Sequence, residues 1–220
     1  MSQPGDGKPL DVEALKEIVR LAAKQLGKVK ADNQEHLFTL ALGLTAAVKK
    51  TLYERADAKF SREPIIEKQG IIQFVKRMRI DAMQKFNQTT VFSAVHYFLD
   101  VKHIEKNMPC GVIIVYMEKK FLPETLRLLK YPYVDYDNDD EVKDGCGAIA
   151  NLIAGQFKKE FISLGYEDLE MSHFQSFVNT APNGIDFPST QEQKYEISFH
   201  IDGIKRMVVE MVMEEIPKNA

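Results

Sequence analysis

The strongest constraint on the fold is one long helical segment set between two groups of strand-like segments. In residues 137–161 (DNDDEVKDGCGAIANLIAGQFKKEF) apolar side chains recur at helical spacing. The flanking segments are rich in β-branched and aromatic residues, as strands are. A chain that passes from strands to a long helix and back predicts an α/β (α+β) domain with a mixed, largely antiparallel sheet and packed helices. The expected strands are 89–101, 111–117, 169–178, 194–201 and 205–213.

Two connections between these strands predict hairpins. Asp202-Gly203 joins the last two strands, and this dipeptide favours a type I′ turn, whose central residues need positive φ. Residues 105–109 are expected to connect the first two strands. A short helix is expected over 121–130, followed by an acidic loop at 135–140.

Helical periodicity dominates the N-terminal part of the chain. Helices are expected over 11–27, with Asp11 as N-cap, then over 33–58 and 65–86. We therefore divide the chain into a helical extension, 1–62, and an α/β domain, 63–216. The apolar stripes of the extension need a partner, which could be the sheet, a second copy of the chain or another protein.

Composition excludes several classes of protein. The formal net charge of −3 argues against a general nucleic-acid binder, which needs a basic surface. No apolar run approaches the roughly 20 residues that span a bilayer, so no membrane partner is expected. The first ten residues have no apolar core typical of a signal peptide. Cys110 and Cys146 match neither a zinc site nor a redox motif, so two buried reduced thiols and a cytoplasmic protein are expected.

No metal or catalytic cluster is evident in the sequence. His96 and His103 are seven residues apart, which on one strand places them on opposite faces. No Ser/His/Asp order, Gly-rich phosphate loop or dinucleotide fingerprint occurs. We therefore expect neither a metal nor a cofactor on this chain.

Two other clusters are interpreted as structural. The first is a basic patch on the expected third helix, which is typical of a solvated helix face. Its members are Lys76, Arg77, Arg79 and Lys85. The second is a set of methionines at even spacing on the last strand, which indicates either core or a dimer interface. Its members are Met207, Met211 and Met213.

The long helix has two different faces. Its expected core face is formed by Val142, Cys146, Ile149, Ile153, Gln156 and Phe157. The opposite face is formed by Asp144, Ala148, Asn151 and Gly155. Asn and Gly both weaken a helix, so this face favours the close approach of another molecule. The alternatives are that a neighbouring helix packs there, or that the small residues are neutral.

The run D-E-V-x-D-x-x-G-x-I-A-N-x-I-A-G in this helix, continued by a Lys-rich end and Leu-Gly-Tyr-Glu, resembles the signature helix of the CheC/CheX family of chemotaxis phosphatases. The order of the surrounding elements agrees with the CheX class. The resemblance covers about residues 70–213. It is specific at the signature helix and weak elsewhere.

What the resemblance implies is a Glu-x-x-Asn pair that reaches into the active site of a phosphorylated CheY-like response regulator. The Asn would position water for in-line attack on the phospho-aspartate, and the Glu would pair with a lysine of the regulator. The regulator itself would hold the Mg²⁺. The resemblance also implies a homodimer, and exposed sheet edges can pair in this way.

This sequence departs from that pattern. Asn151 keeps the amide, but Ala148 stands where the acid is expected, and no Glu in the chain is followed three residues later by Asn. Asp144 lies on the same face, about 10 Å of helix rise from Asn151. Two other pairs have the motif's spacing: Asp81 with Gln84, and Asp135 with Asn138.

Three functions are expected from these residues. The first is a chemotaxis or two-component signalling protein that binds a phosphorylated CheY-like regulator through Asp144, Ala148, Asn151 and Gly155, with a degenerate phosphatase motif. The second is an active aspartyl-phosphate phosphatase in which Asn151 still positions water, because the loss of one catalytic group leaves a residual rate. The third is a structural or assembly protein that reuses the fold.

Overall fold

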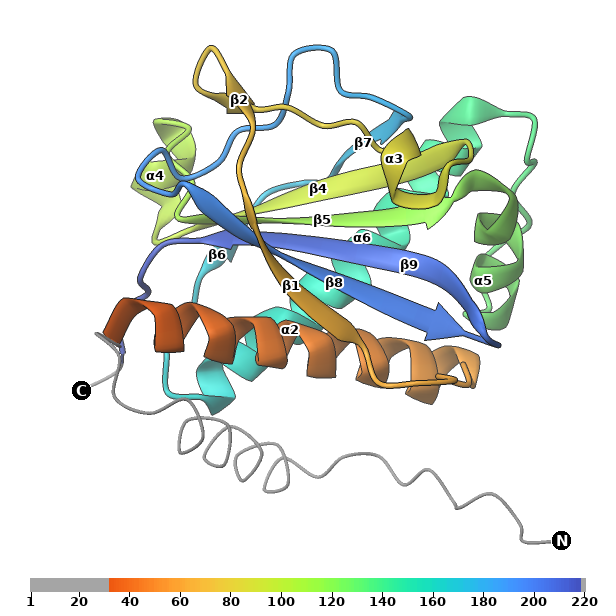
Figure 1. The fold of residues 1–220 in the computed structure, drawn as a ribbon, viewed down its shortest axis with the longest axis horizontal. Coiled ribbons are helices and arrows are strands. Elements are labelled where there is room, and N and C mark those ends of the chain that lie inside the picture. Colours follow the sequence, from red (N-terminus) through yellow and green to blue (C-terminus); the bar gives the residue numbers. More distant parts are fainter. Residues whose placement is uncertain (1–31, 219–220) are drawn as a thin grey trace, which may run out of the picture.

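A computed structural model describes residues 32–218, and it confirms the expected fold class. A seven-stranded sheet has the order β1-β8-β9-β5-β4-β6, with β7 also paired to β4, and all its ladders are antiparallel (Figure 1). A separate two-stranded hairpin joins β2 and β3. The strands are β1 (Ile65–Gly70), β2 (Gln73–Phe74), β3 (Arg77–Met78), β4 (Thr90–Phe98), β5 (Gly111–Glu118), β6 (Glu170–Met171), β7 (Gln175–Val178), β8 (Gln193–Ile201) and β9 (Ile204–Met213).

Helix α6 runs across one face of the sheet, and α2 packs beside it. Short helices lie in the connections between strands. The α-helices are α2 (Asp32–Ala56), α3 (Met83–Phe86), α4 (Val101–Glu105), α5 (Leu122–Leu128) and α6 (Asp139–Ser163), with a 3₁₀ turn at Lys119–Phe121 before α5.

The two faces of the sheet carry separate hydrophobic clusters. The larger cluster lies between the sheet and α2, α5 and α6. The smaller cluster lies on the opposite face, under the segments 71–86 and 179–187. Alternation along β9 shows the division, because Val209 and Met211 belong to the first cluster and Val208 and Val212 to the second. Glu210 therefore points to the face away from α6.

Several predicted elements are confirmed. The helix expected over 33–58 and the long helical segment at 137–161 correspond to α2 and α6, and the strands at 111–117, 194–201 and 205–213 correspond to β5, β8 and β9. The Asp202-Gly203 hairpin joins β8 and β9, with φ of 52° and 82° at its two central residues. The methionines at 207, 211 and 213 are buried in the larger cluster, as the core interpretation predicts.

The third predicted helix, 65–86, is wrong. These residues form β1, the β2–β3 hairpin and the four-residue helix α3. Residues Ile65–Gly70 pair along their whole length with β8, and this long-range pairing overrides the local helical pattern. The helical spacing of apolar residues here is coincidental: Phe74 is 78% exposed at the hairpin, whereas Met78 is fully buried.

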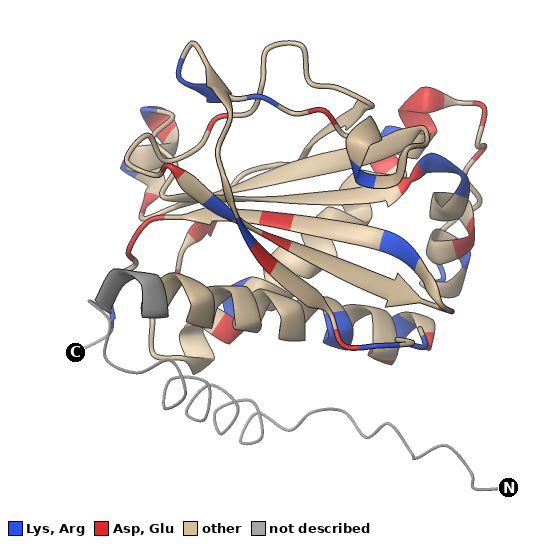
Figure 2. Ribbon diagram, viewed as in Figure 1, with Lys and Arg blue, Asp and Glu red and all other residues tan. Residues whose placement is uncertain are grey.

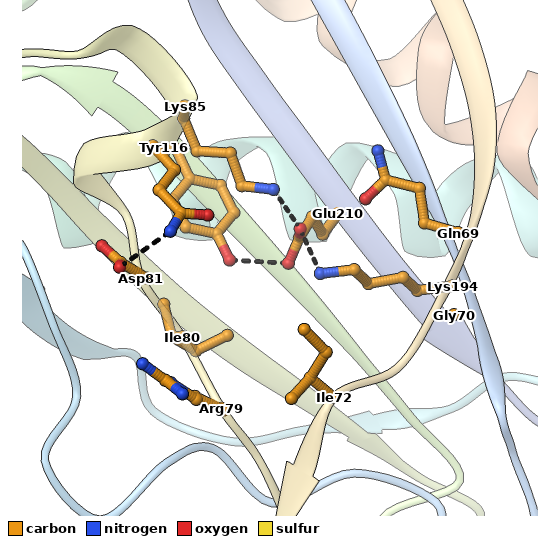
Figure 3. Close-up of a pocket in the computed structure, with 11 residues that line it drawn as sticks. Gln69, Gly70, Ile72, Arg79, Ile80, Asp81, Lys85, Tyr116, Lys194 and Glu210 are labelled. Carbon is orange, nitrogen blue, oxygen red and sulfur yellow. Dashed lines mark hydrogen bonds and ion pairs between the residues drawn. The ribbon is translucent and has the colours of Figure 1, made fainter.

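The basic patch is not the solvated helix face that its sequence predicts. Lys85, on α3, forms an ion pair with Glu210 at 2.5 Å (Figure 3) and a second ion pair with Glu196, also at 2.5 Å. Arg77, on β3, forms an ion pair with Asp186 at 2.9 Å. These partners lie more than 100 residues away in sequence, so no local pattern could reveal them.

Two strand predictions need smaller corrections. The strand expected over 89–101 ends at Phe98, because Asp100 caps α4 by accepting a hydrogen bond from the His103 backbone N–H. His103 therefore lies on a helix and not on the strand that carries His96. The strand expected over 169–178 is divided into β6 and β7.

The helix predicted over 11–27 lies outside the described residues. The described part of the expected extension, α2, contributes its apolar stripe to the same cluster as α6. The buried members of that stripe are Leu40, Leu44, Val48 and Leu52. The division of the chain at residue 62 stays a proposal.

Candidate functional site

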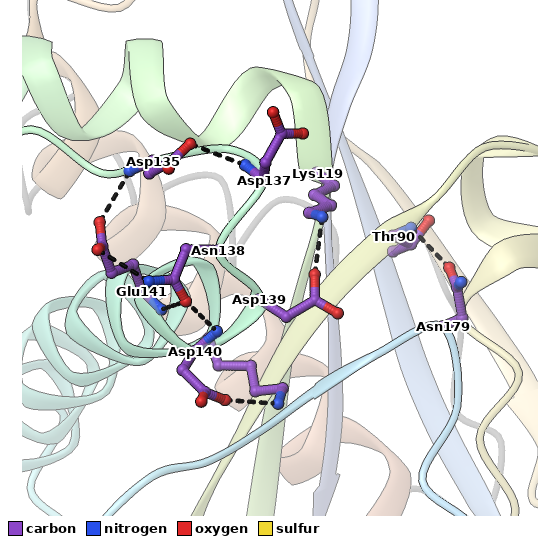
Figure 4. A network of polar contacts seen from close by, with 10 residues as sticks. Thr90, Lys119, Asp135, Asp137, Asn138, Asp139, Asp140, Glu141 and Asn179 are labelled. Atoms are coloured by element: carbon purple, nitrogen blue, oxygen red, sulfur yellow. Dashed lines mark hydrogen bonds and ion pairs between the residues drawn. The ribbon is translucent and has the colours of Figure 1, made fainter.

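The start of α6 is held in place by a network of polar contacts. The Asn138 side-chain oxygen accepts hydrogen bonds from the backbone N–H groups of Asp140 and Glu141, as an N-cap does (Figure 4). The Glu141 carboxylate accepts from the Asp135 backbone N–H and the Asn138 amide. Asp139 forms an ion pair with Lys119 at 2.7 Å. Asn138 is therefore a helix cap and Asp135 a turn residue.

Acidic side chains in the first turn of α6 also suit the helix dipole, because its positive end lies at the N-terminus. Figure 2 shows this acidic end of the helix, which lies beside the connection that follows α5. The lysine partner holds the pKa of the Asp139 carboxyl below its usual value. The start of α6 is thus an anionic surface.

The predicted core face of α6 is confirmed. Val142, Cys146, Ile149, Ile153 and Phe157 are all fully buried, and Gln156 is half-buried. The phenol of Tyr97 on β4 donates a hydrogen bond to the Ala154 carbonyl at 3.0 Å, which fixes the helix on the sheet.

Two glycines of α6 permit close packing, and one of them, Gly147, lies one turn before Asn151 on the same side of the helix. A Cβ at Gly147 would lie 2.2 Å from the Phe174 ring, and a Cβ at Gly145 would lie 2.5 Å from a Leu126 methyl. Phe174 thus lies against the helix backbone beside Ala148. No sequence signal predicts this contact, because Phe174 lies in the connection between two short strands.

Apart from the Phe174 contact at Gly147, the opposite face of α6 is open. Asp144 and Asn151 are exposed, and Ala148 and Gly155 are half-buried. No atom lies within 4 Å of the position that a Cβ at Gly155 would take. Helix α2 packs elsewhere, since Gly43 on α2 faces Phe157, Glu160 and Leu164. A neighbouring helix therefore does not explain Gly155.

Asn151 is available for contact with another molecule. Within residues 32–218 its side-chain amide makes no hydrogen bond, and an amide carries both donors and acceptors. Ala148, one turn before it, offers only a methyl group. The face can therefore accept and donate hydrogen bonds at Asn151 but supplies no carboxylate at position 148.

The alternative acid–amide pair does not join this face. Gln84 donates a hydrogen bond to Asp81 at 3.1 Å, and Asp81 pairs with Thr180 in an isolated bridge. Both side chains line a cavity on the sheet face away from α6. Asp81 and Asn151 therefore cannot act on one bound group.

The two thiols are buried. Burial raises the pKa values of Cys110 and Cys146 to about 12, so both stay protonated near neutral pH. The described residues contain no group of three His, Cys, Asp or Glu side chains placed to hold a metal ion. Among the helices that the structure describes, none has the length and apolar character needed to cross a bilayer.

The chain thus combines an antiparallel sheet, a long helix that covers one face of it, and an exposed amide, that of Asn151, on the outer side of that helix. No family model and no curated protein matches the sequence. Several solved structures are similar to this chain. The chemotaxis protein CheX from Desulfovibrio desulfuricans is 16% identical, with a TM-score of 0.48, over 80% of this chain and 99% of that chain.

Two further solved structures are similar to this chain. CheX from Vibrio vulnificus is 14% identical, with a TM-score of 0.49, over 80% of this chain and 99% of that chain. The CheX–CheY–BeF3–Mg²⁺ complex from Borrelia burgdorferi contains a chain that is 14% identical, with a TM-score of 0.45, over 80% of this chain and 98% of that chain. At such identities and TM-scores, this likeness alone assigns neither a family nor an activity to the chain.

Proposed function

We propose that this chain is a chemotaxis-type signalling protein of the CheC/CheX kind. It binds a phosphorylated CheY-like response regulator through the face of Asp144, Ala148, Asn151 and Gly155. The observation that carries the proposal is that the amide of Asn151 lies exposed on α6, with no hydrogen-bond partner among residues 32–218, between Phe174, which packs on Gly147, and Gly155, which no described atom approaches within 4 Å. The small residues on either side let a partner approach the helix closely.

The expected chemistry depends on what the face contains. The Asn151 amide can accept a hydrogen bond from a water molecule and orient it toward the phospho-aspartate of the partner. The partner regulator holds the Mg²⁺, so this chain needs no cofactor of its own. Because Ala148 supplies no carboxylate to pair with a lysine of the regulator, the complex is weaker and binding dominates over catalysis.

The second candidate function is an active aspartyl-phosphate phosphatase. The retained amide of Asn151 favours it, since a positioned water is the main requirement for this hydrolysis. The loss of one catalytic group typically lowers a rate by about 10²- to 10⁴-fold, so the activity would be slow but measurable.

We also propose that the chain acts in the cytoplasm and forms a homodimer. The edge strand β1 supports the dimer, because it pairs on one side with β8 and has no strand on its other side among residues 32–218. Ile65 on this strand is 41% exposed. Such an edge can pair with a second copy.

The test follows the decay of a phosphorylated CheY-like receiver with and without this protein, together with binding of the beryllofluoride-activated receiver by calorimetry. Binding without acceleration supports the leading proposal. Binding with acceleration that Asn151→Ala abolishes supports the phosphatase. Ala148→Glu is expected to increase affinity and to create or raise activity.

The matched control is Asn183→Ala, an exposed Asn on the loop between β7 and β8. This variant is expected to bind like the unmodified protein. If no activated receiver from the same genome binds, or if Asn151→Ala and Ala148→Glu both bind unchanged, the proposed docking face is wrong.

A further inference from the structure

A cavity of about 250 Å³ lies on the sheet face opposite α6. Its floor is formed by Tyr116, Lys194 and Glu210 from three neighbouring strands, and Lys85 closes one side from α3 (Figure 3). Its rim comes from the chain between β1 and α3, where Arg79 is exposed. The sheet separates the cavity from the face of Asn151, so a ligand in this cavity would be distinct from the regulator of the proposed function.

A fully buried carboxylate lies at the centre of the floor. Glu210 accepts hydrogen bonds from Lys85 and Lys194, each at 2.5 Å, and from the Tyr116 phenol at 2.6 Å. Burial alone would raise the Glu210 pKa, but the two ammonium groups outweigh it and hold the pKa below its usual value. Burial and the neighbouring Glu210 carboxylate raise the Tyr116 pKa, so the phenol stays a donor.

Some N–H donors on the floor of the cavity have no acceptor among the described residues. An ammonium carries three N–H donors, but among residues 32–218 the Lys194 ammonium has a single acceptor, Glu210. Only 12% of the Lys194 side chain is exposed, so solvent does not freely satisfy the other two donors. At the rim, the Arg79 guanidinium has no side-chain partner in the described part of the chain, and it adds five donors.

The charges around the cavity limit what it can hold. Three cationic side chains line it, Arg79, Lys85 and Lys194, against two carboxylates, Asp81 and Glu210. Glu196, outside the lining, takes another hydrogen bond of Lys85. The donors thus favour an anion, while the acidic neighbours oppose a polyanion.

We propose that this cavity binds a small organic anion through one oxyanion group, a carboxylate or a phosphate, held between Lys194 on the floor and Arg79 at the rim. The body of the ligand lies against Ile72 and Ile80, which line the same cavity. The cavity volume of about 250 Å³ lies just below the usual range for ligand pockets, which begins at about 300 Å³, so the ligand is small.

Structural stability alone does not account for this arrangement. Replacing a buried ion cluster by apolar residues of similar size is often neutral or stabilising, so stability is a weak reason for keeping one. Ionisable groups with shifted pKa values inside a cleft are typical of functional sites. Here the cleft, the unused donors and the shifted groups coincide.

The test uses the full chain labelled with ¹⁵N at lysine, titrated with sodium acetate and, separately, with inorganic phosphate. Sodium chloride at matched ionic strength is the reference. The Lys194 side-chain signal is expected to shift and to saturate with at least one of the two anions and not with chloride. Which anion saturates it distinguishes a carboxylate from a phosphate ligand.

Arg79→Gln is expected to weaken the binding about tenfold, as is typical for the loss of one charge-assisted hydrogen bond. Because Arg79 is exposed and outside the buried cluster, the variant keeps the fold. The matched control is Arg127→Gln on α5, which removes the same charge from an exposed position far from the cavity and should bind as the unmodified protein does.

Three results would overturn the proposal. They are a linear response to both anions that matches chloride, a saturating response that leaves the Lys194 signal unmoved, and equal affinities for Arg79→Gln and Arg127→Gln. Calorimetry with the same probes checks the affinities independently. None of these results affects binding of a regulator at Asn151.

Discussion

The two faces of the sheet are built on different principles. On the α6 face, nearly every buried side chain is apolar, and the helices that cover it carry regular stripes. On the other face, irregular segments cover a smaller apolar cluster that surrounds a group of buried charges. The first face is stabilised by the burial of apolar area, which does not depend on the orientation of the contacting groups. The second face depends on ion pairs, which need a defined geometry.

This contrast indicates where a role outside stability is to be expected. The α6 face is explained as core, and its one unusual surface is the outer side of the helix. The opposite face keeps ionised groups in a place where apolar residues often serve a fold as well. Substitutions on each face, and a change of pH, can therefore test whether the two faces differ in this way.

Phe157→Ala is expected to destabilise the protein by about 3–5 kcal/mol, because it removes a fully buried ring and leaves a cavity. The ring contacts both Tyr97 and Phe161. Urea denaturation followed by circular dichroism measures the change. A loss below about 1 kcal/mol would show that the α6 face is not the main source of stability.

Glu210→Gln is expected to destabilise by about 3 kcal/mol, because two nearly buried ammonium groups lose their shared carboxylate. The double variant Glu210→Leu with Lys194→Met should recover much of this loss in the same urea experiment, since Lys85 keeps Glu196. If the double variant is less stable than Glu210→Gln, the fold itself needs the charges.

A fall in pH is expected to remove stability from the face that carries Glu210. The folded-state pKa of Glu210 lies below its ordinary value of 4.5, so its ionisation contributes stability that is fully present above pH 4.5. This contribution is lost as the pH falls below 4.5 toward the folded-state pKa. The stability difference between the unmodified protein and Glu210→Gln should therefore shrink below pH 4.5, and a difference that grows there would contradict the assignment.

Two glycines of α6 give a matched pair with opposite expected signs. Gly147→Ala should destabilise by about 1–3 kcal/mol, because the new methyl would overlap the Phe174 ring. Gly155→Ala should stabilise by up to about 1 kcal/mol, because alanine favours the helix and nothing lies nearby. Thermal melting of both variants measures the change in stability. If both substitutions stabilise, or both destabilise, the two sites are packed alike.

The sequence predicts the α6 face well. Its elements depend on local periodicity, which fixes the long helix, the apolar strands and the Asp202-Gly203 turn. The glycine at position 147 shows the limit, because its partner Phe174 is brought to it only by the folded chain.

The opposite face could not be predicted, because its contacts, like that of Phe174 with Gly147, join segments that are distant in sequence. Local sequence places Lys85 in a solvated patch, but its partners Glu196 and Glu210 come from strands that are more than 100 residues away. The segment 65–86 has helical spacing, yet pairing of β1 with β8 decides its structure. Interactions between distant segments decide this face, and a single sequence does not record them.

The central claim, that the outer face of α6 is a docking surface, is tested most directly by titrating the ¹⁵N-labelled protein with a beryllofluoride-activated CheY-like receiver. We expect the backbone signals of Asp144, Ala148, Asn151 and Gly155 to shift together and the Lys85 and Lys194 signals to stay in place. A receiver that binds and leaves these four signals unmoved, or that moves only signals on the far face of the sheet, would contradict the claim.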